Sequence, residues 1–183
     1  MKISVIQSTC AAINSVYIIN DFIDNKDYLN LLSNKIEKYT EKDEMNRQTN
    51  VKASMTSYKK LLSDEDFNII HVKILETMLN IYKLRTPHPF QEIVASYRDS
   101  WGMAHKKDDH TVNHVHLGST FAGGFYFNVP CYTEMYFDDY EEAVEIKENM
   151  LLLFPGLCKH RVQKHNAYEK RISMAFNIDL VDT

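Results

Sequence analysis

The chain has 183 residues and a formal net charge of -4, with 44% hydrophobic and 25% charged residues. These values are ordinary for a soluble globular protein, and the length favours a single domain, 1–183. No apolar run approaches the roughly 20 residues that span a bilayer, and the residues after Met1 do not form the apolar segment of a secretory signal. We therefore expect no membrane partner and a cytoplasmic location.

Two further classes of protein are disfavoured by composition. Cys10, Cys131 and Cys158 are odd in number and have no CxxC spacing, so we expect neither a disulfide framework nor a cysteine zinc site. The mildly acidic chain has no cluster of Lys and Arg, which argues against a protein that holds nucleic acid through its phosphates. The sequence leaves the oligomeric state open.

Glycine and proline divide the chain into two parts. All five glycines and all four prolines lie after residue 86. Because both residues mark tight turns between strands, we predict that residues 1–86 are mainly helical support and that residues 87–183 form a strand-rich core.

The first part contains two predicted helices. Short β-branched runs at 2–7 and 16–19 predict strands that join a sheet formed later in the chain. Asp24 or Asn25 can cap a helix over 26–39, where apolar residues recur at helical spacing, and 40–50 is predicted to be a loop. A second helix is expected from near Ser63 to about Leu84. Its apolar residues cover more than half its circumference, so we expect it to be well buried, and both helices to cover a sheet.

The second part consists of short apolar or alternating runs separated by turn-forming residues. They lie at 92–97, 121–129, 132–137, 150–154, 158–163 and 171–180. Several short strands at this spacing predict an antiparallel sandwich or barrel. We expect the acidic stretch from Asp138 to Glu148 to be a solvated loop or hairpin.

Three histidines in this part have the pattern of a metal site. His114 and His116 form an HxH pair, and residues i and i+2 of a strand point to the same side, close enough to hold one ion. His160 follows a buried-strand run and a Pro-Gly turn, after which the chain can return it toward the pair in a jelly roll. Three protein ligands with open positions are typical of a catalytic metal site.

Arg171 and Ser173 predict a site for a carboxylate. They share one face of a strand, while Ile172, Met174 and Phe176 occupy the other. If the polar pair points inward, the guanidinium needs an anionic partner, and no internal acid is obviously placed to supply it. A bound carboxylate ligand would satisfy both side chains; an outward orientation would make this an ordinary outer strand.

Together these residues resemble the iron(II)/2-oxoglutarate-dependent dioxygenases, within the group related to prolyl hydroxylases. The resemblance covers roughly residues 92–180. It depends on His114-Val-His116-Leu-Gly-Ser, on Gly123-Gly-Phe-Tyr-Phe, on Leu-Leu-Phe154-Pro155 before His160, and on Arg171-x-Ser173. It implies an α+β fold, a double-stranded β-helix (jelly roll) with the N-terminal helices packed on one face.

The resemblance also implies a function and a site. It implies an enzyme that uses Fe(II) and 2-oxoglutarate to hydroxylate an unknown substrate, either a protein side chain or a small molecule. His114 and His160 would be metal ligands, and Arg171, Ser173 and Tyr126 would bind 2-oxoglutarate. Where most members have Asp or Glu, this chain has His116, which we expect to take the place of the carboxylate.

Alternatives remain at this stage. Asp138 or Asp139 could supply a carboxylate ligand instead of His116. The chain could also be a cupin-like three-histidine metalloprotein that does not use 2-oxoglutarate, or a non-catalytic jelly-roll structural protein. We expect the substrate to be selected by loops at 98–113 and 138–149.

Overall fold

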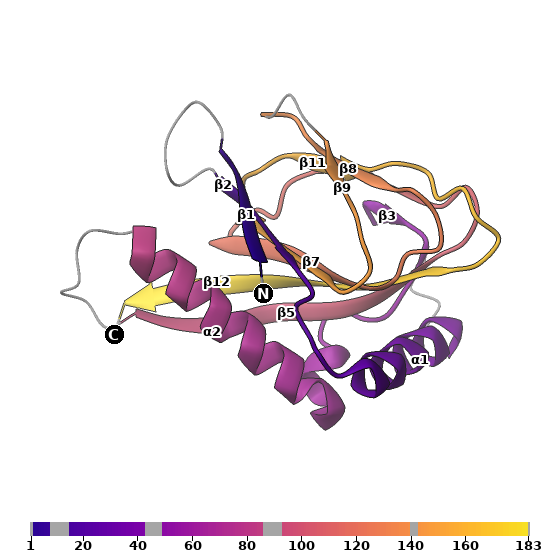
Figure 1. Ribbon diagram of the computed structural model, residues 1–183, viewed down its shortest axis with the longest axis horizontal. Coiled ribbons are helices and arrows are strands. Elements are labelled where there is room, and N and C mark those ends of the chain that lie inside the picture. Colours follow the sequence, from indigo (N-terminus) through magenta and orange to yellow (C-terminus); the bar gives the residue numbers. More distant parts are fainter. Residues whose placement is uncertain (1, 8–14, 43–48, 86–92, 140–142, 183) are drawn as a thin grey trace.

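The computed structural model describes residues 2–7, 15–42, 49–85, 93–139 and 143–182 (Figure 1). Its strands form two antiparallel sheets. The seven-stranded sheet contains, in spatial order, β1 (Lys2–Gln7), β2 (Ser15–Asn20), β10 (Met150–Pro155), β7 (Phe121–Asn128), β12 (Arg171–Asp182), β5 (Ile93–His105) and β4 (Ser54–Met55). The five-stranded sheet contains β3 (Val51–Lys52), β6 (His110–His114), β11 (His160–Val162), β8 (Glu134–Phe137) and β9 (Val144–Glu145).

From β5 onward the chain passes repeatedly between the two sheets. β5, β7, β10 and β12 belong to the larger sheet, and β6, β8, β9 and β11 to the smaller one. This winding is the double-stranded β-helix, or jelly roll, that the sequence resemblance implied. The strands predicted at 2–7 and 16–19 are β1 and β2, and they extend the larger sheet beyond β10.

Both helices lie on the same face of the larger sheet (Figure 1). Helix α1 (Lys26–Lys42) begins where predicted, because the Asn25 side chain accepts a hydrogen bond from the Tyr28 N–H at 3.0 Å. It continues three residues past the predicted end at Tyr39. Helix α2 (Asn68–Arg85) is preceded by two 3-10 turns, η1 (Leu61–Ser63) and η2 (Glu65–Phe67).

The expectation that the second helix is well buried was wrong. Ile70, Ile74 and Met78 are buried against the sheet, whereas Val72 is 53% and Leu84 85% exposed. The apolar residues of this helix therefore exceed what one sheet face can cover.

Among the described residues, α1 and α2 are each too short or too polar to span a membrane.

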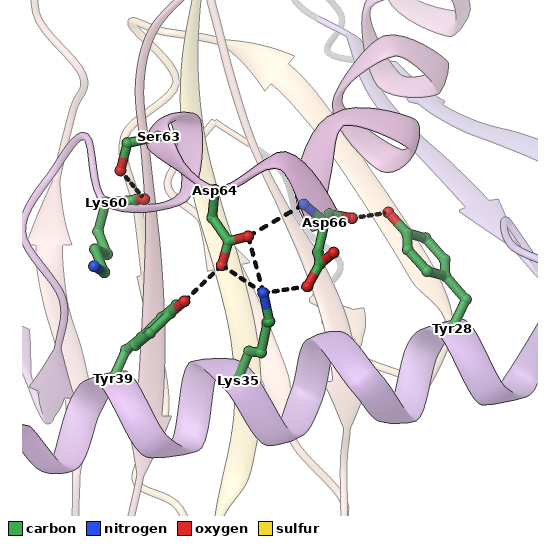
Figure 2. Close-up of polar contacts among 7 residues, drawn as sticks. All are labelled: Tyr28, Lys35, Tyr39, Lys60, Ser63, Asp64 and Asp66. Carbon is green, nitrogen blue, oxygen red and sulfur yellow. Dashed lines mark hydrogen bonds and ion pairs between the residues drawn. The ribbon is translucent and has the colours of Figure 1, made fainter.

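A polar network joins α1 to the segment before α2 (Figure 2). Lys35 Nζ donates to both carboxylate oxygens of Asp64, at 2.9 and 3.0 Å, and also contacts the Asp66 carboxylate. Tyr39 donates to Asp64 Oδ2 at 2.6 Å, and Tyr28 donates to the Asp66 carbonyl at 2.7 Å. Asp64 also caps η2 by accepting from the Asp66 N–H at 3.1 Å. These contacts fix the two helical segments relative to each other on the sheet.

The alternation of side chains along β12 separates a structural face from a polar one. Ile172, Met174, Phe176 and Ile178 join the core under the helices. Arg171 and Ser173 point to the other side, between the two sheets, and each is only 1% exposed. Burial of the apolar residues fixes the register, since a shift by one residue would exchange the two faces.

Candidate functional site

The three predicted histidines converge at one point between the sheets. His114 is the last residue of β6 and lies directly opposite His160, the first residue of β11. The ring centroids of His114 and His160 are 4.3 Å apart, and His116 lies 5.0 Å from His114 and 5.2 Å from His160. Potential ligand atoms of the three rings lie within 4.8 Å of one another. Antiparallel pairing of β6 and β11, rather than strands facing each other across the barrel, therefore brings His160 to the pair.

Two backbone carbonyls set the tautomers of His114 and His160. His114 Nδ1 is 2.8 Å from the carbonyl of Val112, and His160 Nδ1 is 2.9 Å from the carbonyl of Cys158. A carbonyl only accepts, so each Nδ1 carries the proton and each Nε2 keeps its lone pair. Metal-bound histidines are usually oriented in this way by a second hydrogen bond.

His116 lies just beyond the end of β6, and a turn of the chain positions it. Its N–H donates to the carbonyl of Gly156 at 2.8 Å. A Cβ atom on Gly156 would lie 2.2 Å from the carbonyl oxygen of Ser119 and 2.9 Å from that of His116. Only glycine fits this close approach between the turn after β10 and the backbone that carries His116.

Burial keeps all three imidazoles neutral at physiological pH. It lowers the pKa of His114, lowers that of His116 to about 4 and lowers that of His160 to about 3. Neighbouring histidines add to the effect on His116 and His160, and the Asn177 side chain opposes it at His116. The sign of these shifts suits a metal site, because a ligand imidazole must be deprotonated.

The carboxylates considered as alternative ligands are placed elsewhere. Asp138 is exposed; its oxygens accept from Asn113 Nδ2 at 3.0 and 2.9 Å and pair with Lys159 at 3.1 Å. Asp139 is exposed beside it. Among the described residues, the group able to hold one ion consists of the three histidines.

A cavity of about 50 Å³ adjoins the histidines between the two sheets. Its lining combines the three rings with aromatic, apolar and a few polar side chains, among them Trp101, Met103, His105, Thr111, Tyr126, Phe154, Arg171 and Ser173. Tyr126 on β7 lies opposite Ser173 of β12. All six residues proposed for the site from sequence thus border one cavity.

Arg171 lies in this cavity, and no carboxylate of the described residues forms an ion pair with it. Its Nη1 donates to Thr133 Oγ1 at 3.4 Å, and its Nε has no hydrogen-bond partner among the described residues. Ser173 Oγ, also buried, has none either. Burial lowers the pKa of Arg171, and the charges of Tyr126, Cys131 and Asp109 act against that shift. A guanidinium and a hydroxyl buried in this way are suited to a carboxylate ligand.

His105 completes the inner end of the cavity and was not identified from the sequence. It is 1% exposed and lies opposite Arg171 in the pairing of β5 with β12. Its Nε2 is 3.4 Å from Thr111 Oγ1, and its Nδ1 has no partner in the described part of the chain. The clue available in the sequence was its spacing from Trp101 and Met103, with which it shares a face of one strand. Burial lowers the pKa of His105 well below its usual value, so this imidazole is neutral.

His110 and His165 do not join the cluster. His165 is buried, with Nε2 bonded to the carbonyl of Glu169 at 2.7 Å, and His110 lies half-buried at the start of β6. Gly123 of β7 lies in regular pairing with β10 and β12. A Cβ atom there would lie 2.5 Å from the Phe176 ring and 2.3 Å from the Leu152 carbonyl oxygen.

No established protein-family model matches the sequence, and no curated protein matches it. Solved structures match its fold. A prolyl-4-hydroxylase from Pseudomonas putida has a TM-score of 0.65 at 13% identity, covering 90% of this chain and 92% of that one. A viral collagen prolyl hydroxylase from Paramecium Bursaria Chlorella virus-1, in complex with 2OG, has a TM-score of 0.63 at 11% identity, covering 89% and 94%.

A third structure comes from outside the prolyl hydroxylases. HygX from Streptomyces hygroscopicus, with nickel and 2-oxoglutarate bound, has a TM-score of 0.65 at 9% identity, covering 91% of this chain and 83% of that one. At these identities the likeness establishes the fold. The chain therefore has the jelly-roll fold of the prolyl hydroxylases and other 2-oxoglutarate-dependent oxygenases, as the sequence resemblance implied.

Proposed function

We propose that this protein is an iron(II)- and 2-oxoglutarate-dependent oxygenase that hydroxylates its substrate. In the balanced reaction, substrate R–H, dioxygen and 2-oxoglutarate give R–OH, succinate and carbon dioxide. One oxygen atom enters the substrate and the other enters succinate, while the C–C bond next to the keto group of 2-oxoglutarate breaks. The proposal assigns the chemistry to residues 87–183, with residues 1–86 as support.

The observation that carries this proposal is the position of Arg171 and Ser173 in the same cavity as the three histidines. A buried guanidinium without an anionic partner is costly, and no carboxylate in the described part of the chain lies at ion-pair distance from Arg171. A dicarboxylate bound beside the histidines would offset that cost. Its distal carboxylate would accept from Arg171 Nε and from Ser173 Oγ, and Tyr126 and His105 border the same end of the cavity.

The histidines fit the metal that the proposal requires. His114, His116 and His160 would hold Fe(II), leaving open coordination positions for 2-oxoglutarate and dioxygen. When bound, the metal supplies dioxygen activation coupled to the oxidative decarboxylation of 2-oxoglutarate. The Val112 and Cys158 carbonyls orient two of the rings, and burial holds all three neutral at the pH of the reaction.

The neutral His116 distinguishes this site from one with a carboxylate ligand. Replacing an anionic ligand by an imidazole leaves the metal with one more unit of positive charge, which strengthens its attraction for an anionic co-substrate. The same feature supports a second candidate function, a three-histidine metalloprotein that does not use 2-oxoglutarate. The two proposals differ over Arg171, whose burial the second leaves unexplained.

Anaerobic metal and co-substrate binding tests the proposal. We expect the purified protein to bind Fe(II) and then to develop a weak visible charge-transfer band when 2-oxoglutarate is added. His160→Ala should lose metal binding, whereas Arg171→Ala should retain the metal and lose the band at limiting 2-oxoglutarate. His110→Ala and Arg161→Ala are matched controls outside the cavity and should behave like the wild type. Metal binding without the band would favour the second candidate, and failure to bind a metal would exclude both.

A further inference from the structure

A second cavity, here called the outer cleft, lies beside His114 and His116. It measures about 290 Å³ and meets the inner cavity at Val51, Trp101, His114 and His116. Polar and aromatic residues supply much of its remaining wall, which consists of Thr49, Asn50, Met55, Tyr58, Asp99, Val115 and Asn177. Its volume is close to the lower limit of about 300 Å³ for small-molecule sites, which suits one side chain or a small metabolite.

The two cavities together have opposite charges at their ends. Alternate residues of the paired strands β5 and β12 line them: from the inner end outward β5 contributes His105, Met103, Trp101 and Asp99, and β12 contributes Arg171, Ser173, Ala175 and Asn177. The inner end therefore carries a guanidinium and the outer end a carboxylate. His114 and His116 lie where the two cavities meet.

The carboxylate of Asp99 is available to a ligand. It accepts one hydrogen bond, from Asn177 Nδ2 at 3.3 Å, and it forms no ion pair with a Lys, Arg or His of the described chain. Asp99 is half-buried, so its charge is screened less than that of a surface carboxylate. An unpaired anion beside an apolar wall is suited to a cation.

Aromatic side chains form the wall between Asp99 and the histidines. The Tyr58 and Trp101 rings meet edge to face at 5.2 Å, and the Trp101 ring centroid is 6.2 Å from that of His116. Trp101 is 5% exposed, and its Nε1 has no hydrogen-bond partner in the described chain. Such a wall packs against the aliphatic part of a ligand, and aromatic faces also attract cations.

We infer that the outer cleft selects a substrate with a protonated amine or guanidinium group, which pairs with Asp99 while its neighbouring carbon atoms lie along Trp101 beside the metal. This inference rests on the proposed function and specifies its substrate class. Asp99 would repel an anionic substrate. A neutral substrate would remove water from the Asp99 carboxylate without supplying a partner for its charge. The hydroxylated carbon is then only a few bonds from the cationic group, because Asp99 and the histidines border one small cleft.

Fluorescence of Trp101 allows binding to be measured without turnover. Trp101 is the only tryptophan of the chain and lies in the wall of the cleft, so its emission reports ligands there. The metal-free protein would be titrated with n-pentylamine and n-pentylguanidine, and with N-pentylacetamide as a neutral compound of similar length. Blocked tripeptides Gly-Lys-Gly and Gly-Arg-Gly would be titrated separately, to distinguish a protein side chain from a free amine as the source of the cation.

We expect at least one cationic probe to bind about tenfold more tightly than N-pentylacetamide, as one charge-assisted hydrogen bond would provide. Asp99→Asn, which keeps the shape of the side chain, should abolish this preference. Asp21→Asn is the matched control, because it removes the same charge at an exposed residue outside the cleft whose positive φ of 51° asparagine tolerates. Binding of the tripeptides would indicate a protein substrate, and binding of the free amines alone a small molecule.

The inference is overturned if the neutral amide binds wild-type protein as tightly as the amine and guanidine, a comparison that does not depend on any variant folding. It is also overturned if folded Asp99→Asn keeps the preference. Because the titration uses no metal and no 2-oxoglutarate, its result is separate from the charge-transfer test. If the charge-transfer band does not form but the preference for cationic probes persists, the oxygenase proposal is rejected. If the band forms but the preference for cationic probes is absent, only the proposed substrate class is rejected.

Discussion

Replacing Arg171 with methionine should separate stability from co-substrate binding. The guanidinium is 1% exposed, has a single long hydrogen bond to Thr133, and lacks an ion pair with any described carboxylate. Exchanging a buried, poorly compensated charge for an apolar side chain of similar length often stabilises a protein by about 1–4 kcal/mol. Thr133 keeps a partner after the change, because its Oγ1 also donates to the Cys131 carbonyl at 3.2 Å. We therefore expect Arg171→Met to be more stable than the wild type when 2-oxoglutarate is absent.

Adding the co-substrate should narrow or reverse this difference in stability, because only the wild type gains from binding it. A ligand present at 100 times its Kd stabilises the folded state by about 2.7 kcal/mol, and for a chain of this length each kcal/mol raises Tm by roughly 2–4 °C. Thermal unfolding of the anaerobic Fe(II) protein, followed by circular dichroism, should show that 2-oxoglutarate raises the Tm of the wild type by roughly 5–11 °C and does not raise that of Arg171→Met. Arg161→Met, at an exposed site, should keep the rise. The reasoning is refuted if Arg171→Met is the less stable protein without 2-oxoglutarate, or if it retains the full increase in Tm.

Three further predictions concern the scaffold. Burial lowers the pKa of His71 to about 4; because the unfolded chain then binds the extra proton, stability is full above pH 6.5 and falls by up to about 3 kcal/mol as the pH drops to 4. Denaturant titrations should show this slope, and His71→Gln should reduce it. Gly156→Ala should weaken metal binding by tenfold or more, since the added methyl group displaces the backbone of His116; unchanged affinity in a metal titration would contradict this. Asp64→Asn should lower the free energy of unfolding by about 1–2 kcal/mol, because it weakens the acceptor for Lys35 and Tyr39, and Asp21→Asn should have no such effect.

The stretch at 98–113, which we expected to be a substrate-selecting loop, is mainly strand in the structure. The sequence directed attention to a loop at 98–113, but β5 continues through that stretch to His105, and β6 begins at His110. Alternation along the strand, rather than a flexible loop, therefore places Asp99 and Trp101 in the cleft. The run 92–97 contained the apolar alternation that marks a strand, whereas the mixed residues after Tyr97 obscured its continuation. From Asp99 to His105 the side chains on both faces of β5 are buried or half-buried, so the polar residues there face the cavities rather than solvent.

Local patterns in the sequence determined much of this protein. Helical spacing located α1 and α2, and the alternation of Arg171 and Ser173 with Ile172 and Met174 assigned one side of β12 to the core. This information is local, because propensity and side-chain direction depend on neighbouring residues. The HxH spacing likewise identified two of the three histidines.

Tertiary structure decided what the local patterns could not. Pairing of β6 with β11 places His160 against His114, and the turn at Gly156 fixes His116 beyond the end of its strand. Pairing of β5 with β12 places His105 beside Arg171 and Asp99 beside Asn177. These neighbours are distant in the chain, and their register is set by the burial of entire strand faces. The sequence alone therefore proposed six residues for one site, while strand pairing determined that they border one cavity, with Arg171 at one end and Asp99 in the adjoining cleft.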